Sequence, residues 1–92
     1  MIKSFKHKEL KKFFVQGDSR RLNPNHVDRI RDLLKILNNA RELRELNFPG
    51  SGLHSLKGNL QGHFALKVSG NWRLTFQFIE GDVHVLDYQD YH

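Results

Sequence analysis

Hydrophobic and polar positions follow two different periods along this chain, and the period changes near its middle. From Val27 onward, apolar side chains recur every three or four residues, which is the spacing of one face of an α-helix. The stripe consists of Val27, Ile30, Leu34 and Leu37, widened by Leu33, Ile36 and Ala40. We predict an amphipathic helix with an N-cap at Asn23–Pro24, an end near Asn38–Ala40 and a short extension through Leu43 and Leu46.

The segment before this helix shows the same period over a shorter distance. Leu10, Phe13 and Phe14 fall at helical spacing within HKELKKFFVQG, and Gly17 is a suitable residue to end a helix there. The four residues IKSF, 2–5, can form a short first strand. The N-terminal part of the chain therefore predicts a strand followed by two helices.

Beyond the turn cluster Asn47–Gly52 the period becomes two, which is typical of strands with one buried face. The alternation is regular in HFALKV, 63–68, and in WRLTFQF, 72–78. It is less regular in VHVLDY, 83–88, where successive pairs of apolar residues favour opposite faces. SGN, 69–71, and EGD, 80–82, predict tight turns between these strands.

These elements predict one α+β domain over residues 1–92, with the order β-α-α-β-β-β and an antiparallel sheet. Both helices are expected on the face formed by Phe64, Leu66, Trp72, Leu74, Phe76 and Phe78. The opposite face then carries His63, Lys67, Arg73 and Gln77. A polar, basic sheet face of this kind is suited to a strand of RNA or DNA.

The net charge of +5 and the pI of about 9.8 agree with a polyanionic partner. The 92 residues provide only a modest core, so we expect a shallow surface site. The chain has no cysteine, which excludes disulfides and thiolate metal sites. No apolar run reaches the roughly 20 residues of a membrane span, and no metal-ligand motif is evident. We expect a cytoplasmic protein without metal, cofactor or membrane partner.

Several side chains match the needs of metal-free RNA cleavage, in which the 2′-OH of the RNA is the nucleophile. Arg73 offers a planar fork for phosphate oxygens, and Lys57 adds a point charge. The terminal Asp90, Tyr91 and His92 leave the neighbouring strand at its end, and imidazole transfers protons near neutral pH. Of the other histidines, we predict His7 and His26 to be surface residues.

The segments MIKSFKHKEL, LHSLKGNLQGHF, NWRLTFQF and the terminal DYQDYH resemble the HigB toxins. These toxins belong to the RelE/ParE superfamily of type II toxin–antitoxin systems. The resemblance covers all 92 residues, and the order and spacing of the motifs carry it. It implies a RelE-like, microbial-RNase-like fold and an endonuclease that cleaves mRNA in the A site of the 70S ribosome. It also implies a partner, a HigA-like helix-turn-helix antitoxin, through which operator DNA is reached only indirectly.

Transferred residue by residue, the resemblance implies two groups of site residues. The catalytic group is His54, Asp90, Tyr91 and His92. The phosphate- and RNA-binding group is Lys57, Asn71 and Arg73. His54 and His92 are the acid/base candidates, and the sequence leaves open which is base and which is acid. The nearby α-carboxylate and Asp90 would favour a protonated His92 and hence a proton donor.

Two other functions are compatible with the fold and the charge. A ParE-like toxin would bind a protein such as DNA gyrase without catalysis, and inhibition of supercoiling alone would identify it. A plain basic RNA-binding module would show salt-dependent RNA affinity and no cleavage. The terminal Asp-Tyr-His favours the nuclease over the ParE-like toxin, because a protein-binding toxin has no evident use for it.

Overall fold

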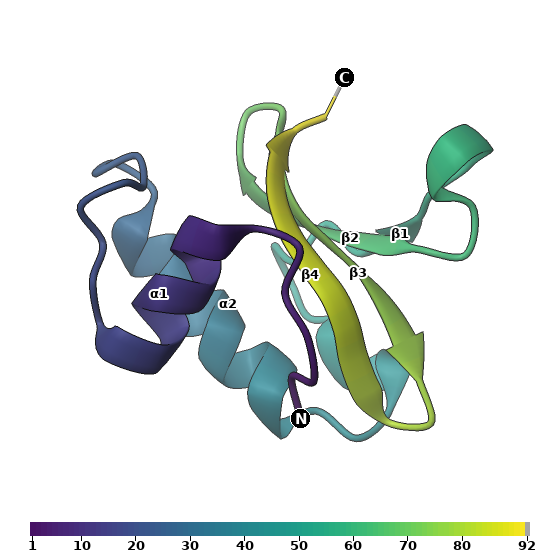
Figure 1. The fold of residues 1–92 in the computed structure, drawn as a ribbon. Coiled ribbons are helices and arrows are strands. Elements are labelled where there is room, and N and C mark those ends of the chain that lie inside the picture. Colours follow the sequence, from purple (N-terminus) through teal and green to yellow (C-terminus); the bar gives the residue numbers. More distant parts are fainter. Residues whose placement is uncertain (92) are drawn as a thin grey trace.

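The computed structural model describes residues 1–91 and confirms the α+β class (Figure 1). Its α-helices are α1, Lys8–Gln16, and α2, Val27–Asn39. One antiparallel sheet has the strand order β1–β2–β3–β4. The strands are β1 (His54–Ser55), β2 (Phe64–Ser69), β3 (Trp72–Ile79) and β4 (Asp82–Asp90). Two short 3-10 helices, η1 (Leu43–Leu46) and η2 (Gly58–Leu60), flank β1 in the chain.

The C-terminal ends of both helices agree with the sequence, whereas the start of α2 does not. Gly17 ends α1 with a φ of +73°, and its N–H donates to the carbonyl of Phe13. The end of α2 at Asn39 is also as predicted. The N-cap prediction at Asn23–Pro24 is wrong, because α2 begins at Val27 with His26 before it. Asn23 instead accepts a hydrogen bond from the backbone of Asn25, which closes a separate turn.

The edges of the sheet differ from the prediction. Residues 2–5 run beside β4 but form only two isolated parallel bridges, Ile2 to Val83 and Phe5 to Leu86 (Figure 1). At the other edge, β1 is a two-residue strand that the sequence pattern did not reveal. Two residues are too few to display a period, so such a strand is recognised only by its pairing with β2.

The irregular alternation of β4 has a structural cause, which is a β-bulge. The register shifts by one residue between Thr75 and Gln77, and Val85 adopts a φ of +48° at the bulge. Its N–H donates to the hydroxyl of Ser4 at 2.8 Å, which ties the bulge to the N-terminal segment. Val83, Leu86 and Tyr88 all face the core. Strict alternation would put Val83 on the opposite face from the other two, and the extra residue of the bulge removes this conflict.

The core lies between the two helices and one face of the sheet, as predicted. Helix α2 contributes Ile30, Leu33, Leu34 and Leu37, and α1 contributes Leu10 and Phe13. The sheet contributes Leu66, Val68, Leu74, Phe76, Val83, Leu86 and Tyr88. Among residues 1–91, no helix is both long and apolar enough to cross a membrane.

Candidate active site on the open face of the sheet

The sheet face turned away from the helices carries the candidate site, and strand pairing orders its side chains into rows. One row runs from Lys67 through Arg73 to Gln89. These residues alternate with the buried Leu66, Leu74 and Tyr88, so their side chains point to the open face. We refer to it below as the open face.

The β2–β3 hairpin and the end of β4 bring together four of the predicted site residues. Asn71 lies in the hairpin turn, and its carbonyl accepts the N–H of Tyr91 at 2.7 Å. Trp72 pairs with Asp90, and Arg73 follows directly on β3. Ordinary strand pairing thus joins residues that lie far apart along the chain.

Arg73 is half-buried, and its guanidinium folds back over the hairpin. One guanidinium nitrogen donates to the carbonyls of Gly70 and Trp72. These bonds restrict the long side chain to one region of the open face. A cation whose position is already restricted loses less entropy when it meets a phosphate.

A hollow of about 360 Å³ lies between the η2 loop and the end of β4. Its lining includes Lys57 and Tyr91, two predicted site residues from distant parts of the chain. Gln89 also lines it, and Gln89 pairs with Arg73 across the strands. The remaining lining residues are Lys6, Asn59 and Leu60. The hollow therefore connects the Lys57 loop with the row that contains Arg73.

The open face was predicted to be polar and basic, but its centre is covered and buried. Ala65 and Thr75 lie on this face, yet they are 0% and 1% exposed. Leu56, which precedes the η2 loop, is buried too and lies outside the main core cluster. The amide of Gln89 donates to the Thr75 hydroxyl at 2.7 Å. A small second layer therefore supports the η2 loop.

His54 occupies the far end of the next row. This row runs across the four strands in the order His54, Ala65, Thr75 and Asp87. His54 is exposed and faces the same side as the Arg73 row, from which it is one row removed. The remaining predicted site residue, His92, lies outside the described residues.

Two histidines that we expected on the surface have structural roles. His26 is buried, and its Nδ1 lies 2.6 Å from the hydroxyl of Tyr88. Burial raises the pKa of that phenol. His7 is half-buried and caps α1, with its Nδ1 accepting the N–H of Leu10. The surface prediction is therefore wrong for His26, whose imidazole is buried, whereas His7 stays partly exposed and serves as the cap of α1.

The lining residues Lys6 and Gln89 were missed at the sequence level. Lys6 belongs to a generally basic segment, so its charge did not distinguish it. Gln89 has a local signal, because it alternates with the buried Tyr88 near the end of β4. The bulge at Val85 obscured that alternation when the whole strand was considered.

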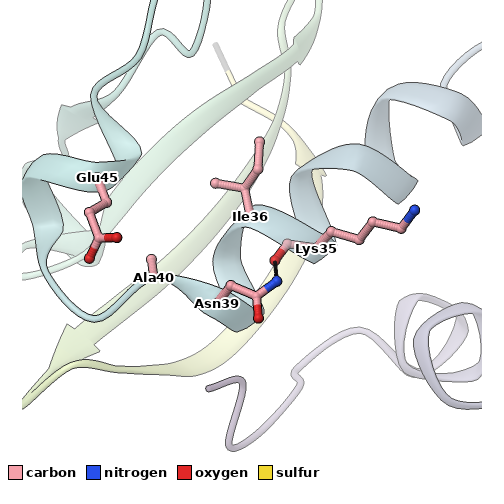
Figure 2. A pocket seen from close by; sticks show the side chains of 5 residues that line it. All are labelled: Lys35, Ile36, Asn39, Ala40 and Glu45. Atoms are coloured by element: carbon pink, nitrogen blue, oxygen red, sulfur yellow. Dashed lines mark hydrogen bonds between the residues drawn. The ribbon is translucent and has the colours of Figure 1, made fainter.

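A separate hollow of about 300 Å³ lies where α2 ends (Figure 2). Polar side chains that line it form hydrogen bonds with the nearby backbone. The Asn39 amide donates to the carbonyl of Lys35. The backbone N–H groups of Arg41 and Glu42 donate to Glu45 and hold its carboxyl pKa below the usual value. Within residues 1–91, no group of three or more acidic or histidine side chains is arranged to hold a metal ion.

Known proteins are similar to this chain over most or all of its length. The family model described as "RelE-like toxin of type II toxin-antitoxin system HigB" matches residues 3–92. The chain is 49% identical to Endoribonuclease HigB of Proteus vulgaris over 92 residues, which cover both chains completely. It is 33% identical to Toxin HigB-1 of Vibrio cholerae over 83 residues, which cover 88% of this chain and 87% of that one.

Solved structures show the same fold at low sequence identity. The YoeB–YefM complex from Staphylococcus aureus contains a chain with a TM-score of 0.64 and 19% identity, with 100% of this chain and 95% of that chain covered. A point mutant of YafQ from E. coli gives a TM-score of 0.64 and 16% identity, with 98% and 91% covered. These likenesses confirm the RelE-like fold that we predicted.

Proposed function

This chain belongs to the HigB-like family of RelE-like toxins of type II toxin–antitoxin systems, and we propose that it is an endoribonuclease that cleaves messenger RNA. One observation carries the proposal. Lys57, Tyr91 and Gln89 line a single hollow, and Gln89 pairs with Arg73. The site thus offers Lys57 in the hollow and Arg73 in the adjoining row as cations for a phosphate, with the Tyr91 phenol in the same hollow as Lys57.

The chemistry that fits these residues is attack by the 2′-OH of the RNA. The 2′-oxygen forms a bond to phosphorus and gives its proton to a base, while the bond to the 5′-oxygen breaks. An acid protonates that leaving oxygen, so the products are a 2′,3′-cyclic phosphate and a 5′-OH. Lys57 and Arg73 neutralise the extra negative charge of the transition state.

The proton transfers are assigned to the two histidines that the family resemblance implies, His54 and His92, which act as the acid/base pair. Asp90 and Tyr91 orient the substrate or share the proton transfers, and Asn71 positions the nucleotide. The backbone bond from Tyr91 to the carbonyl of Asn71 supports a common location for these groups.

The natural substrate in this proposal is mRNA in the A site of the 70S ribosome. The size of the site supports it, because a hollow of about 360 Å³ is at the lower end of the range for ligand pockets. A shallow site gains from a partner that holds the RNA strand in place. The protein acts in the cytoplasm, where its ribosomal substrate is found.

The proposed antitoxin is a HigA-like helix-turn-helix protein, and operator DNA is bound only through it. The family description supports an antitoxin partner, and a similar fold occurs in the YoeB–YefM complex. Co-expression of this chain with a gene for a small helix-turn-helix protein from the same operon tests the pairing. Recovery of a stable complex and relief of growth arrest are the expected results.

Single-turnover cleavage of mRNA on programmed ribosomes tests the activity. We expect Lys57→Ala and Arg73→Ala each to slow cleavage by about 100-fold or more, since each removes transition-state charge stabilisation. Lys35→Ala is the matched control, because Lys35 is exposed on α2 and lines the hollow of Figure 2 instead. Cleavage at the parent rate by both site variants, or inhibition of DNA supercoiling by an RNA-inactive parent, would contradict the proposal.

A further inference from the structure

The imidazole of His54 is held by the loop that precedes it. Its Nδ1 lies 3.0 Å from the carbonyl oxygen of Gly52. A carbonyl oxygen only accepts hydrogen bonds, so Nδ1 must carry the proton. In the neutral ring the other nitrogen, Nε2, is then unprotonated. This tautomer can take a proton from a hydroxyl, whereas the opposite tautomer would present an N–H.

The Gly52 carbonyl is itself fixed, because the loop passes very close to β2. The N–H of Lys67 donates to the carbonyl of Ser51 at 2.8 Å, and Ser51 is only 1% exposed. Gly52 has a φ of +63°, and a Cβ there would lie 2.9 Å from the Cβ of Lys67. Glycine is therefore needed at position 52 for both its conformation and its lack of a side chain.

Arg29 on α2 fastens this loop to the rest of the molecule. Its Nε and Nη2 donate to the carbonyl of Lys67 at 3.1 and 3.0 Å. Nη2 also donates to the carbonyl of Gly50 at 2.8 Å. One planar guanidinium thus joins the helix, strand β2 and the loop that leads to His54. A lysine could not reproduce this geometry, because its N–H donors all lie on one nitrogen and do not form a planar fork.

We infer that Arg29 and Gly52 are positioning residues that hold His54 as the proton acceptor of the cleavage reaction. The inference rests on the proposed function for the reaction itself, but the tautomer is a property of the protein alone. With His54 taking the proton of the 2′-OH, a different group supplies the proton for the leaving 5′-oxygen. Neither Arg29 nor Gly52 needs to touch the RNA.

The tautomer is measured directly by long-range ¹⁵N–¹H NMR of the histidine rings at a pH where they are neutral. The His54 signals are assigned by their loss in His54→Gln. We expect a protonated Nδ1 and an unprotonated Nε2 in the parent. A protonated Nε2 would overturn the inference while leaving the proposed nuclease activity intact. Failure of the parent to cleave mRNA would overturn the proposed function while leaving the tautomer result intact.

The role of the Arg29 hydrogen bonds to Gly50 and Lys67 is tested by Arg29→Gln, with Arg31→Gln as the matched control. Arg31 is on the same helix, but it pairs with Asp28 and lies over the ring of Phe13. We expect Arg29→Gln to alter the His54 tautomer signals and to slow single-turnover cleavage by about tenfold, through misplacement of the reacting group. The ribosome concentration for half-maximal rate should be unchanged, and Arg31→Gln should alter neither property. Unaltered signals and rate in Arg29→Gln would overturn the inference.

Two further variants remain informative if Arg29→Gln folds poorly, as judged by circular dichroism. Arg29→Lys keeps the positive charge and N–H donors on one nitrogen but loses the planar fork, so we expect it to retain part of both the rate and the parent tautomer signals. Gly52→Ala should lose both, whereas Gly17→Ala is its control. Gly17 has a similar φ of +73°, but nothing lies within 4 Å of a Cβ there. Equal cleavage rates in the two alanine variants would contradict the role of Gly52.

Discussion

The two faces of strands β2 and β3 differ in their burial and in their expected function. On the helix-covered face, Leu66, Leu74 and Phe76 are all fully buried. On the open face, Lys67, Arg73 and Gln77 alternate with them and retain access to solvent. Apart from Ala65 and Thr75, which are buried at the centre of the open face, a substitution should therefore change mainly the free energy of unfolding on the covered face and mainly the cleavage rate on the open face. Adjacent residues of one strand provide matched pairs for testing this separation.

The largest expected effect is on the covered face, at Phe76. Truncation of this fully buried side chain in Phe76→Ala should lower the free energy of unfolding by about 3–5 kcal/mol, because it leaves a cavity. Its neighbour Gln77 is half-buried on the open face, so Gln77→Ala should cost only about 0.5 kcal/mol. Urea unfolding followed by circular dichroism measures both values. Similar costs for the two variants would contradict the separation of the faces.

A smaller effect, on rate rather than stability, is expected on the open face at Tyr91. Loss of the hydroxyl in Tyr91→Phe should slow cleavage by about 10- to 100-fold, since it lines the hollow with Lys57. The free energy of unfolding should change by no more than about 0.5 kcal/mol. Single-turnover cleavage and urea unfolding of the same preparation check the two statements. A loss of stability without a loss of cleavage rate would contradict a role of the Tyr91 hydroxyl in the reaction.

The complementary change is Tyr88→Phe on the covered face. The Tyr88 hydroxyl lies 2.6 Å from Nδ1 of the buried His26, so its removal should lower the free energy of unfolding by about 1 kcal/mol. Cleavage by the folded variant should match the parent. Tyr88 and Tyr91 are close in the chain, yet the two variants should show opposite patterns. A Tyr88→Phe protein that folds stably but cleaves slowly would break the comparison.

The smallest expected effect is a dependence of stability on alkaline pH. Burial raises the pKa of Tyr88 above its ordinary 10.0, so the folded state holds the phenolic proton more tightly than the unfolded state. This contribution is complete below pH 10.0 and is lost as the pH rises toward the folded-state pKa. Absorbance titration of Tyr91→Phe, in which Tyr88 is the remaining tyrosine, should give a midpoint above 10.0. A midpoint at or below this value in the folded protein would contradict the expectation.

The parts of the fold that were predictable are those with a long, uninterrupted period. The stripe from Ile30 to Leu37 and the alternation from Trp72 to Phe78 each repeat often enough to identify the element and its buried face. Strand β1 has two residues, and the N-terminal segment forms two bridges, so neither can show a period. Their structure depends on partners elsewhere in the chain.

The candidate site also has a part that the local sequence predicts and a part that depends on tertiary contacts. Arg73 and Lys57 are recognisable from charge and from the turn pattern near them. The family resemblance adds Asn71, whose sequence context alone indicates only a turn. The hollow itself depends on how the η2 loop lies against β4, and the contact between His26 and Tyr88 spans 62 positions. Contacts between distant parts of the chain cannot be recognised in a local sequence pattern. The role of each predicted residue in cleavage stays a prediction.

The bulge at Val85 has a consequence for how chains of this family vary in length. It supplies β4 with one residue more than β3 needs, since Thr75 pairs with Asp87 but Gln77 pairs with His84. A homologue shorter by one residue at position 85 can therefore keep every other side chain of the strand on its original face. A deletion between Leu86 and Gln89 would instead reverse the facing of the residues between the gap and the bulge. We expect alignment gaps within this strand to concentrate at Val85.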